Sequence, residues 1–100
     1  MFVHHVLFYL NNPDSTADRD ALVAGLQTLI PIEVVKLAHI GKVADTNRAV
    51  IDRSYSVSWL MLFETKADQD IYQDHPVHHE FVKNCAHLWE KVVIYDSDDV

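Results

Sequence analysis

The segment from Tyr55 to Glu64 constrains the fold of this chain most, because its side chains alternate along its whole length. Every second position is aromatic or apolar, and mostly serine or leucine fills the positions between. A two-residue period places alternate side chains on opposite faces of a β-strand. We therefore predict a central strand whose aromatic face lies against a core. That face carries Tyr55, Val57, Trp59, Met61 and Phe63.

Three further segments have strand-like patterns. β-Branched and aromatic residues from Phe2 to Leu10 predict the first strand. Alternation from Val34 to Val43 predicts the second strand, and the run from Val92 to Tyr95 predicts the last. The stretch from Ala44 to Arg53 shows no sustained period, which predicts a long loop. The acidic tail, DSDDV, is predicted to be solvated.

Two helices are predicted between these strands. Ser15 to Asp18 has the form of a capping box, and apolar residues then recur at helical spacing until Pro31. A similar box, Thr65 to Asp68, opens a helix that should break at Pro76, because the residue before a proline avoids the α region. The helical stripe then continues to Lys91. This βαββαβ order predicts an α+β, ferredoxin-like domain with a four-stranded antiparallel sheet.

Length and composition are those of one folded domain, which we expect to span residues 1–100. Fifteen acidic and eight basic residues give a formal charge of -7, which disfavours binding to nucleic acid or an anionic membrane. The amino-terminal apolar run is too short to cross a bilayer and lacks the features of a signal peptide. With Cys85 as the single cysteine, these features predict a cytoplasmic protein without a membrane partner.

Both faces of the predicted sheet are apolar, although the helices of this topology cover only one of them. A large exposed apolar face marks a partner surface, and an identical face from a second copy covers it by symmetry. We therefore predict a homodimer through the sheet faces. The alternative is that the loop or the tail folds over this face within one chain. On strand one, Val3, Leu7 and Tyr9 lie on one face and Phe2, Val6, Phe8 and Leu10 on the other, and strand three carries Leu60 and Leu62 opposite its aromatic face.

The densest polar cluster of the sequence is Tyr72 together with the segment His75 to His79. His78 lies three and seven residues before Phe81 and Cys85, so it should share their inward helical face. An inward histidine beside a cavity can act as a general acid or base, and a tyrosine hydroxyl can donate to a developing oxyanion. Tyr72 and His78 are therefore candidate catalytic residues.

His5 lies in the middle of the first strand between apolar neighbours. The strand period leaves two positions open for it, beneath the helices beside Tyr72 and His78, or at the partner face. For every buried histidine the alternative to a catalytic role is a structural role, in which the imidazole only forms a hydrogen bond to a backbone carbonyl.

Other chemistries find less support in the sequence. His75 and His79 are four residues apart, but no carboxylate pattern completes a ligand set, and we predict no metal site. Cys85 lies on an apolar stripe, where a free cysteine behaves as a small hydrophobe. Gly25 and Gly41 are the only glycines, so no phosphate-binding loop is present, and we predict no cofactor.

Four segments together resemble the stress-responsive A/B barrel (Dabb) family nearly from end to end. They are His5 to Phe8, Gly41-Lys42, Ser54-Tyr55 and Tyr72 to His78. The most specific is the Tyr-x-x-His-Pro-x-His pattern of the last segment. The resemblance implies a ferredoxin-like monomer whose sheet packs on that of its partner to form a dimeric α+β barrel.

The family resemblance also implies site residues. A plant polyketide cyclase of this kind uses a strand-one histidine, a tyrosine and a second histidine, and the matching positions here are His5, Tyr72 and His78. The first helix of this chain has no tyrosine where the cyclase has one, so pocket shape and substrate are expected to differ. The residues expected to line the ligand cavity are Leu7, Phe81 and Trp89.

Three functions are compatible with these residues. The first is cofactor-independent acid–base chemistry, cyclase- or isomerase-like, or binding, on a small apolar or aromatic carbonyl compound. In it His78 is the base, Tyr72 the hydrogen-bond donor and His5 the orienting group. The second is a non-catalytic stress-response or interaction protein with structural histidines. The third is a cofactor-free monooxygenase or haem-handling protein, as found among other dimeric α+β barrels. Whether the chain is an enzyme stays open at this point.

Overall fold

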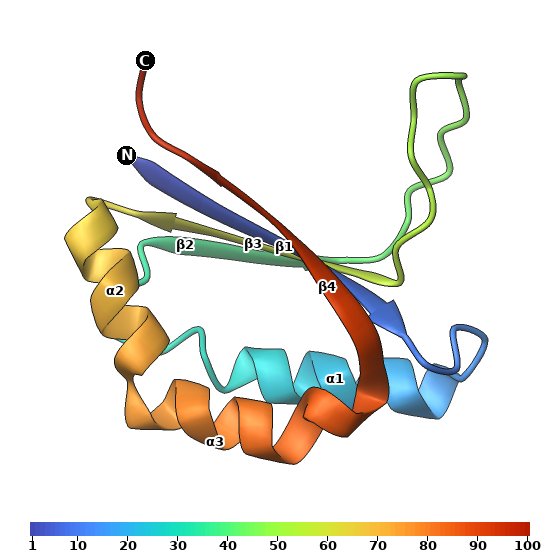
Figure 1. Cartoon of the computed structure of the whole chain (residues 1–100), viewed down its shortest axis with the longest axis horizontal. Coiled ribbons are helices and arrows are strands. Elements are labelled where there is room, and N and C mark those ends of the chain that lie inside the picture. Colours follow the sequence, from blue (N-terminus) through green and yellow to red (C-terminus); the bar gives the residue numbers. More distant parts are fainter.

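The computed structural model describes residues 1–100 as one antiparallel sheet with three helices (Figure 1). The strands follow the order β2-β3-β1-β4, and every neighbouring pair is antiparallel. This is the predicted ferredoxin-like βαββαβ arrangement, which is thereby confirmed. The elements are β1 (Phe2–Leu10), α1 (Thr16–Gln27), β2 (Leu37–Gly41), β3 (Val57–Phe63), α2 (Lys66–Asp74), α3 (Pro76–Cys85), η1 (Ala86–Leu88) and β4 (Trp89–Ser97).

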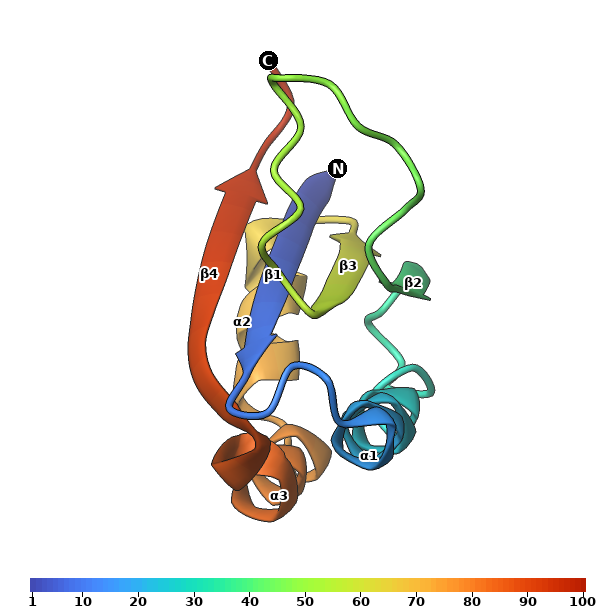
Figure 2. The ribbon, with the colours of Figure 1, turned by 90° about the vertical axis from the view of Figure 1, so that its right-hand side faces the viewer.

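All three helices lie on one side of the sheet, as Figure 1 shows. In the turned view of Figure 2, α1 lies at the β2 side and α3 at the β4 side. The core fills the layer between helices and sheet, because even-numbered residues of β1 and odd-numbered residues of β3 point into it. The largest fully buried side chains are Trp59, Tyr72, Phe63, Leu22, Leu26, Leu29, Met61 and Val57.

The helices begin where the capping boxes predicted. Ser15 Oγ accepts a hydrogen bond from the backbone N–H of Asp18, and the hydroxyl of Thr65 caps α2 in the same way. Helix α2 ends at Asp74, and Pro76 occupies the first turn of α3, where its missing N–H costs nothing. The predicted break at Pro76 is confirmed.

The ends of α3, β4 and β2 differ from the sequence prediction. Helix α3 stops at Cys85 instead of continuing to Lys91, and β4 spans Trp89–Ser97 instead of Val92 to Tyr95. Strand β4 pairs with β1 along nearly its whole length, and this pairing outweighs the helical spacing that continues to Lys91. Asp96, which was predicted to lie in the solvated tail, therefore belongs to the sheet. Strand β2 is shorter than predicted, because Val34 and Val35 pack against the core outside the ladder.

The sheet face opposite the helices, here called the open face, carries no helix (Figure 1). The Lys42 to Ser56 connection contains no helix or strand and includes the loop predicted from Ala44 to Arg53. It projects away from the helices at one end of the sheet (Figure 1), where Tyr9 Oη lies 3.1 Å from Ser54 Oγ. No helix of the chain combines the length and hydrophobicity that a membrane span requires. The residues of the open face include Val3, His5, Leu7, Tyr9, Leu37, His39, Ser58, Leu60, Leu62, Lys91, Val93 and Tyr95.

Candidate functional site

A pocket of about 130 Å³ lies between the helices and the β1–β4 half of the sheet. Nine of its twelve lining residues are hydrophobic, so a bound molecule would be largely removed from water. Val82, Val92 and Ile94 line it and are each more than a third exposed, which places the mouth between α3 and β4. The lining residues are His4, Val6, Phe8, Trp59, Tyr72, Gln73, His78, Phe81, Val82, Trp89, Val92 and Ile94.

Tyr72 of α2 is the central polar group of this pocket. Its side chain is 1% exposed, and its hydroxyl oxygen accepts a hydrogen bond from Trp59 Nε1 at 3.2 Å. Burial raises the pKa of Tyr72 to about 12, so the phenol keeps its proton at neutral pH. No group of the chain accepts that proton in a hydrogen bond. The hydroxyl is therefore available to donate to a ligand.

Two imidazoles flank the Tyr72 ring edge-on. The ring of His4 lies 6.2 Å from it and the ring of His78 lies 5.0 Å from it, measured between centroids. His4 comes from β1 and is 5% exposed, whereas His78 comes from the first turns of α3. The pocket thus combines one phenol with two histidines from three different elements.

The protonation of His78 is fixed by its neighbours. Gln73 Oε1 accepts from Gln69, which turns the amide N–H₂ of Gln73 toward His78 Nε2 at 3.3 Å. The ring nitrogen therefore accepts this hydrogen bond and carries no proton. Burial lowers the pKa of His78, and the nearby His79 and His4 lower it further. The imidazole of His78 is thus neutral at pH 7.

His4 has a carboxylate partner. Its Nδ1 lies 2.5 Å from Asp96 Oδ1, and the two residues are directly opposite in the β1–β4 ladder. An ionised carboxylate only accepts hydrogen bonds, so Nδ1 carries the proton and Nε2 of a neutral ring keeps a free lone pair. A carboxylate in this position orients the ring and stabilises its positively charged form.

Aromatic side chains form one wall of the pocket. Phe8 lies 4.9 Å from Trp89, and Phe81 stacks on Trp89 at 5.8 Å between ring centroids. These rings come from β1, β4 and α3, and β1 and α3 also carry the pocket histidines His4 and His78.

The structure brings some of the sequence-predicted site residues together and separates others. Tyr72, His78, Phe81 and Trp89 all line the pocket. His5 and Leu7 do not, because odd-numbered residues of β1 point to the open face. This settles the position that the sequence left open for His5, and it corrects the expected cavity position of Leu7.

His5 is in a different environment from the pocket histidines. On the open face its Nε2 lies 2.8 Å from Ser58 Oγ. Burial lowers the pKa of His5, with further contributions from His39 and His4. The strand-one histidine of the pocket is therefore His4.

Sequence reasoning missed His4 and Asp96. The signal for His4 was present, since position 4 shares its strand face with Phe2, Val6 and Phe8. The local sequence could not indicate a role for Asp96, because its hydrogen-bond partner is His4, which lies 92 positions away in the chain. No group of three or more His, Cys, Asp or Glu side chains is close enough together to hold a metal ion.

A four-stranded antiparallel sheet with helices on one face and a histidine–tyrosine pocket beneath them defines a ferredoxin-like α+β protein. The sequence matches the stress-responsive A/B barrel domain, Dabb, over residues 2–99. The chain belongs to this family, as the resemblance of its motifs predicted. No curated protein matches the sequence.

Three solved structures are similar to this chain. A protein from Arabidopsis thaliana shares 26% identity and a TM-score of 0.83, over 100% of this chain and 96% of the other. A dimeric ferredoxin-like protein of unknown function from Thermobifida fusca shares 18% identity and a TM-score of 0.76, over 96% and 88%. A hydroxynitrile lyase from Passiflora edulis shares 25% identity and a TM-score of 0.74, over 96% and 91%.

Proposed function

We propose that the chain is a cofactor-independent acid–base catalyst that acts on a small aromatic carbonyl compound or its hydroxynitrile adduct in the Tyr72 pocket. The observation that carries this proposal is the Tyr72 hydroxyl, which is held by Trp59 between two imidazoles while its own proton is free to donate. A positioned donor in a site removed from water stabilises a developing oxyanion far better than it would in bulk water.

The three polar groups then take different roles. His4 is the base, because its Nε2 lone pair is free and Asp96 compensates the positive charge that proton transfer creates. Tyr72 donates to the substrate oxygen. His78, expected from the sequence to be the base, is instead a neutral neighbour whose Nε2 lone pair is engaged by Gln73.

Pocket size supports a substrate with a single ring. An apolar protein cavity of about 150 Å³ accommodates benzene, and the pocket here holds about 130 Å³ and opens at its mouth. A hydroxynitrile is a carbonyl compound with hydrogen cyanide added across its double bond. In the proposed cleavage, His4 takes the hydroxyl proton, the bond to cyanide breaks, and the proton is returned to cyanide. The products are the aldehyde and hydrogen cyanide.

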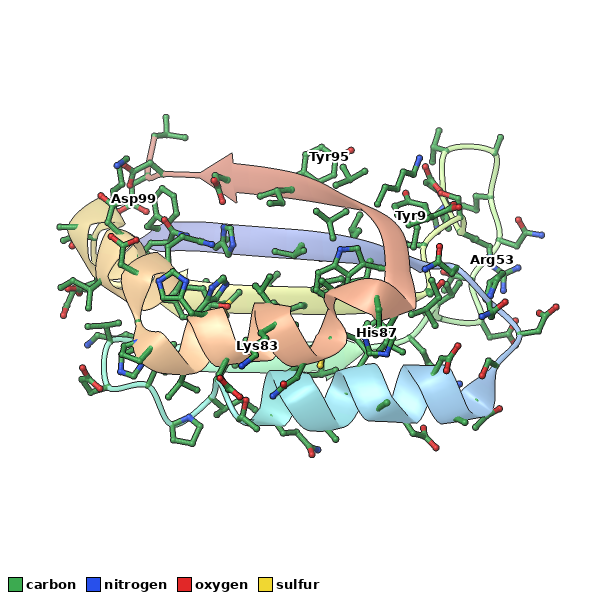
Figure 3. All side chains as sticks on the ribbon, turned by 60° about the horizontal axis from the view of Figure 1, so that its bottom comes forward. Tyr9, Arg53, Lys83, His87, Tyr95 and Asp99 are labelled. Carbon is green, nitrogen blue, oxygen red and sulfur yellow. The ribbon has the colours of Figure 1, made fainter.

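Mandelonitrile cleavage, followed by the absorbance of benzaldehyde, tests this proposal. We expect turnover by the parent, a loss of about 100-fold or more for His4→Ala, and a smaller loss for Tyr72→Phe. His87→Ala is the matched control, because His87 is exposed and lines no pocket (Figure 3). A parent that neither cleaves mandelonitrile nor binds benzaldehyde would refute the proposal.

A second candidate, a non-catalytic interaction protein, is supported by the hydrogen bonding of the interior. No side-chain nitrogen or oxygen that is completely shielded from solvent lacks a hydrogen-bond partner, and His4 is bonded to Asp96, so this histidine also has a structural explanation. On this account His4→Ala only destabilises the fold, by about 1–3 kcal/mol. Comparing the loss of unfolding free energy with the loss of turnover in that variant separates the two candidates.

We also propose that residues 1–100 form one domain that pairs as a homodimer through the open face. Apolar side chains from all four strands lie on this face, and Leu37 and Tyr95 are 51% and 62% exposed in the single chain. The ferredoxin-like relative from Thermobifida fusca is dimeric. An isologous pairing of two open faces would cover this apolar surface.

A further inference from the structure

A second cavity, here called the α1 cleft, lies at the other edge of the sheet from the Tyr72 pocket. Its volume is about 330 Å³, and the two cavities share no lining residue. The cleft lies between α1 and the adjoining ends of β2 and β3, on the β2 side of the sheet seen in Figure 2. Its lining residues are Arg19, Val23, Gln27, Ile40, Gly41, Lys42 and Val57.

The charges of the α1 cleft are all positive. Arg19 and Lys42 line it and no carboxylate does, although acidic residues outnumber basic ones fifteen to eight in the chain. Arg19 Nε lies 3.8 Å from Asp20, but both side chains are well exposed, and such surface pairs are weak. Lys42 forms no ion pair within the chain. Two cations therefore face the cleft without a strong internal partner.

The rest of the cleft is suited to an apolar body. Val57 is 1% exposed, and Ile40 packs against the core, so these side chains provide a firm apolar floor. Val23 and Gln27 follow Arg19 at intervals of four residues, which places all three on one face of α1. A ligand lying along this face would meet a guanidinium at one end and an aliphatic side chain next to it.

We propose that the α1 cleft binds a small organic anion, a carboxylate or a phosphate monoester on a short aromatic or aliphatic body. The planar guanidinium of Arg19 matches two oxygens of either head group, and the Lys42 ammonium adds a point charge. The apolar floor binds the body. This site is separate from the Tyr72 pocket and does not depend on the chemistry proposed there.

Titration calorimetry with benzoate and phenyl phosphate tests the proposal on the full chain. We expect binding at low ionic strength that weakens with added salt, and the tighter of the two probes identifies the preferred head group. Benzamide, the uncharged analogue of benzoate, should bind at least about tenfold more weakly. Arg19→Gln and Lys42→Gln should each weaken binding of the anion by about tenfold.

Matched controls locate the binding. Lys83→Gln and Arg53→Gln remove the same charges from exposed positions outside every cavity (Figure 3) and should leave the affinity unchanged. Tyr72→Phe should also leave it unchanged, which distinguishes this site from the pocket. The proposal is overturned if neither anion binds at millimolar concentration, if benzamide binds as tightly as benzoate, or if Arg19→Gln and Lys42→Gln bind the anion as the parent does.

Discussion

His4 and His5 are consecutive residues with opposite environments. The two-residue period of β1 turns His4 toward the helices, where Asp96 and Tyr72 are its neighbours, and turns His5 to the open face, where it contacts Ser58. A one-residue change in register would exchange the two histidines and remove the carboxylate partner from the pocket. The chemistry of each histidine is thus set by strand geometry and not by residue type.

Asp96→Asn tests the role assigned to His4. An asparagine amide can donate to Nδ1 and hold the ring in the other tautomer, in which Nε2 carries the proton and is no longer a base. We expect kcat/KM for mandelonitrile to fall by about tenfold or more, with the fold retained. Asp98→Asn is the control, because Asp98 is exposed and does not contact His4. Equal activity of the two variants would contradict the assignment.

At the scale of the elements, the break between α2 and α3 brings Tyr72 and His78 together in the pocket. Tyr72 and His78 are six residues apart, and in one straight helix their side chains would point about 120° apart. The extended backbone of His75 and the proline that follows it redirect the chain, and the two rings lie 5.0 Å apart in the pocket. The Tyr-x-x-His-Pro-x-His pattern therefore produces the bend between α2 and α3 and also supplies the side chains of Tyr72, His75 and His78.

Helix α2 holds Tyr72 and should depend on its amino-terminal cap. The Thr65 hydroxyl accepts from the backbone N–H of Asp68, and loss of such a cap costs about 1 kcal/mol. We expect Thr65→Ala to lower the free energy of unfolding by this amount in urea denaturation. Thr46→Ala, in the exposed connection between β2 and β3, should have no measurable effect. Equal stability of the two variants would show that the cap contributes nothing.

The sequence was sufficient for the types and order of the elements, because their periods of 2 and 3.6 residues are local properties. It was insufficient at the start of β4, where Trp89 continues the helical spacing of Phe81 and Cys85 but pairs with Leu10 in the sheet. Tyr72 and His78 could be predicted from their own segment. Asp96 could not, because its partner His4 is distant in sequence and adjacent only in the folded sheet.

For the molecule as a whole, the proposed dimer depends on the apolar open face. Leu60 lies near the middle of that face, between His5 of β1 and His39 of β2. A carboxylate introduced there would have to be desolvated in the interface. We therefore expect Leu60→Asp to convert the dimer to a monomer in light-scattering measurements. Val50→Asp, at an 86% exposed position in the β2–β3 connection, should remain a dimer. A parent that is already monomeric would contradict the proposal.

The same face should make the dimer sensitive to acid. On the open face His5 contacts Ser58, lies opposite Leu60 and Tyr95, and has His39 beyond Leu60, and none of these groups is a carboxylate. Burial already lowers the pKa of His5 in the single chain, and pairing of the open faces would remove the ring further from water, so the separated chain would bind the proton more readily than the proposed dimer.

Association should therefore be strongest above the lowered pKa that His5 has in the single chain, and it should weaken as the pH falls below that pKa. Dimer dissociation constants measured between pH 5 and 8 check this expectation. His5→Gln should flatten the dependence, whereas His87→Gln should not. A dimer that tightens in acid would contradict it.

A crystal structure of the protein with bound benzaldehyde tests the central claim most directly. We predict that the ring lies against Phe81 and Trp89, with the carbonyl oxygen within hydrogen-bond distance of the Tyr72 hydroxyl and the carbonyl carbon beside His4. Benzaldehyde bound at any other place, or a Tyr72 pocket that stays empty at saturating ligand, would contradict the account.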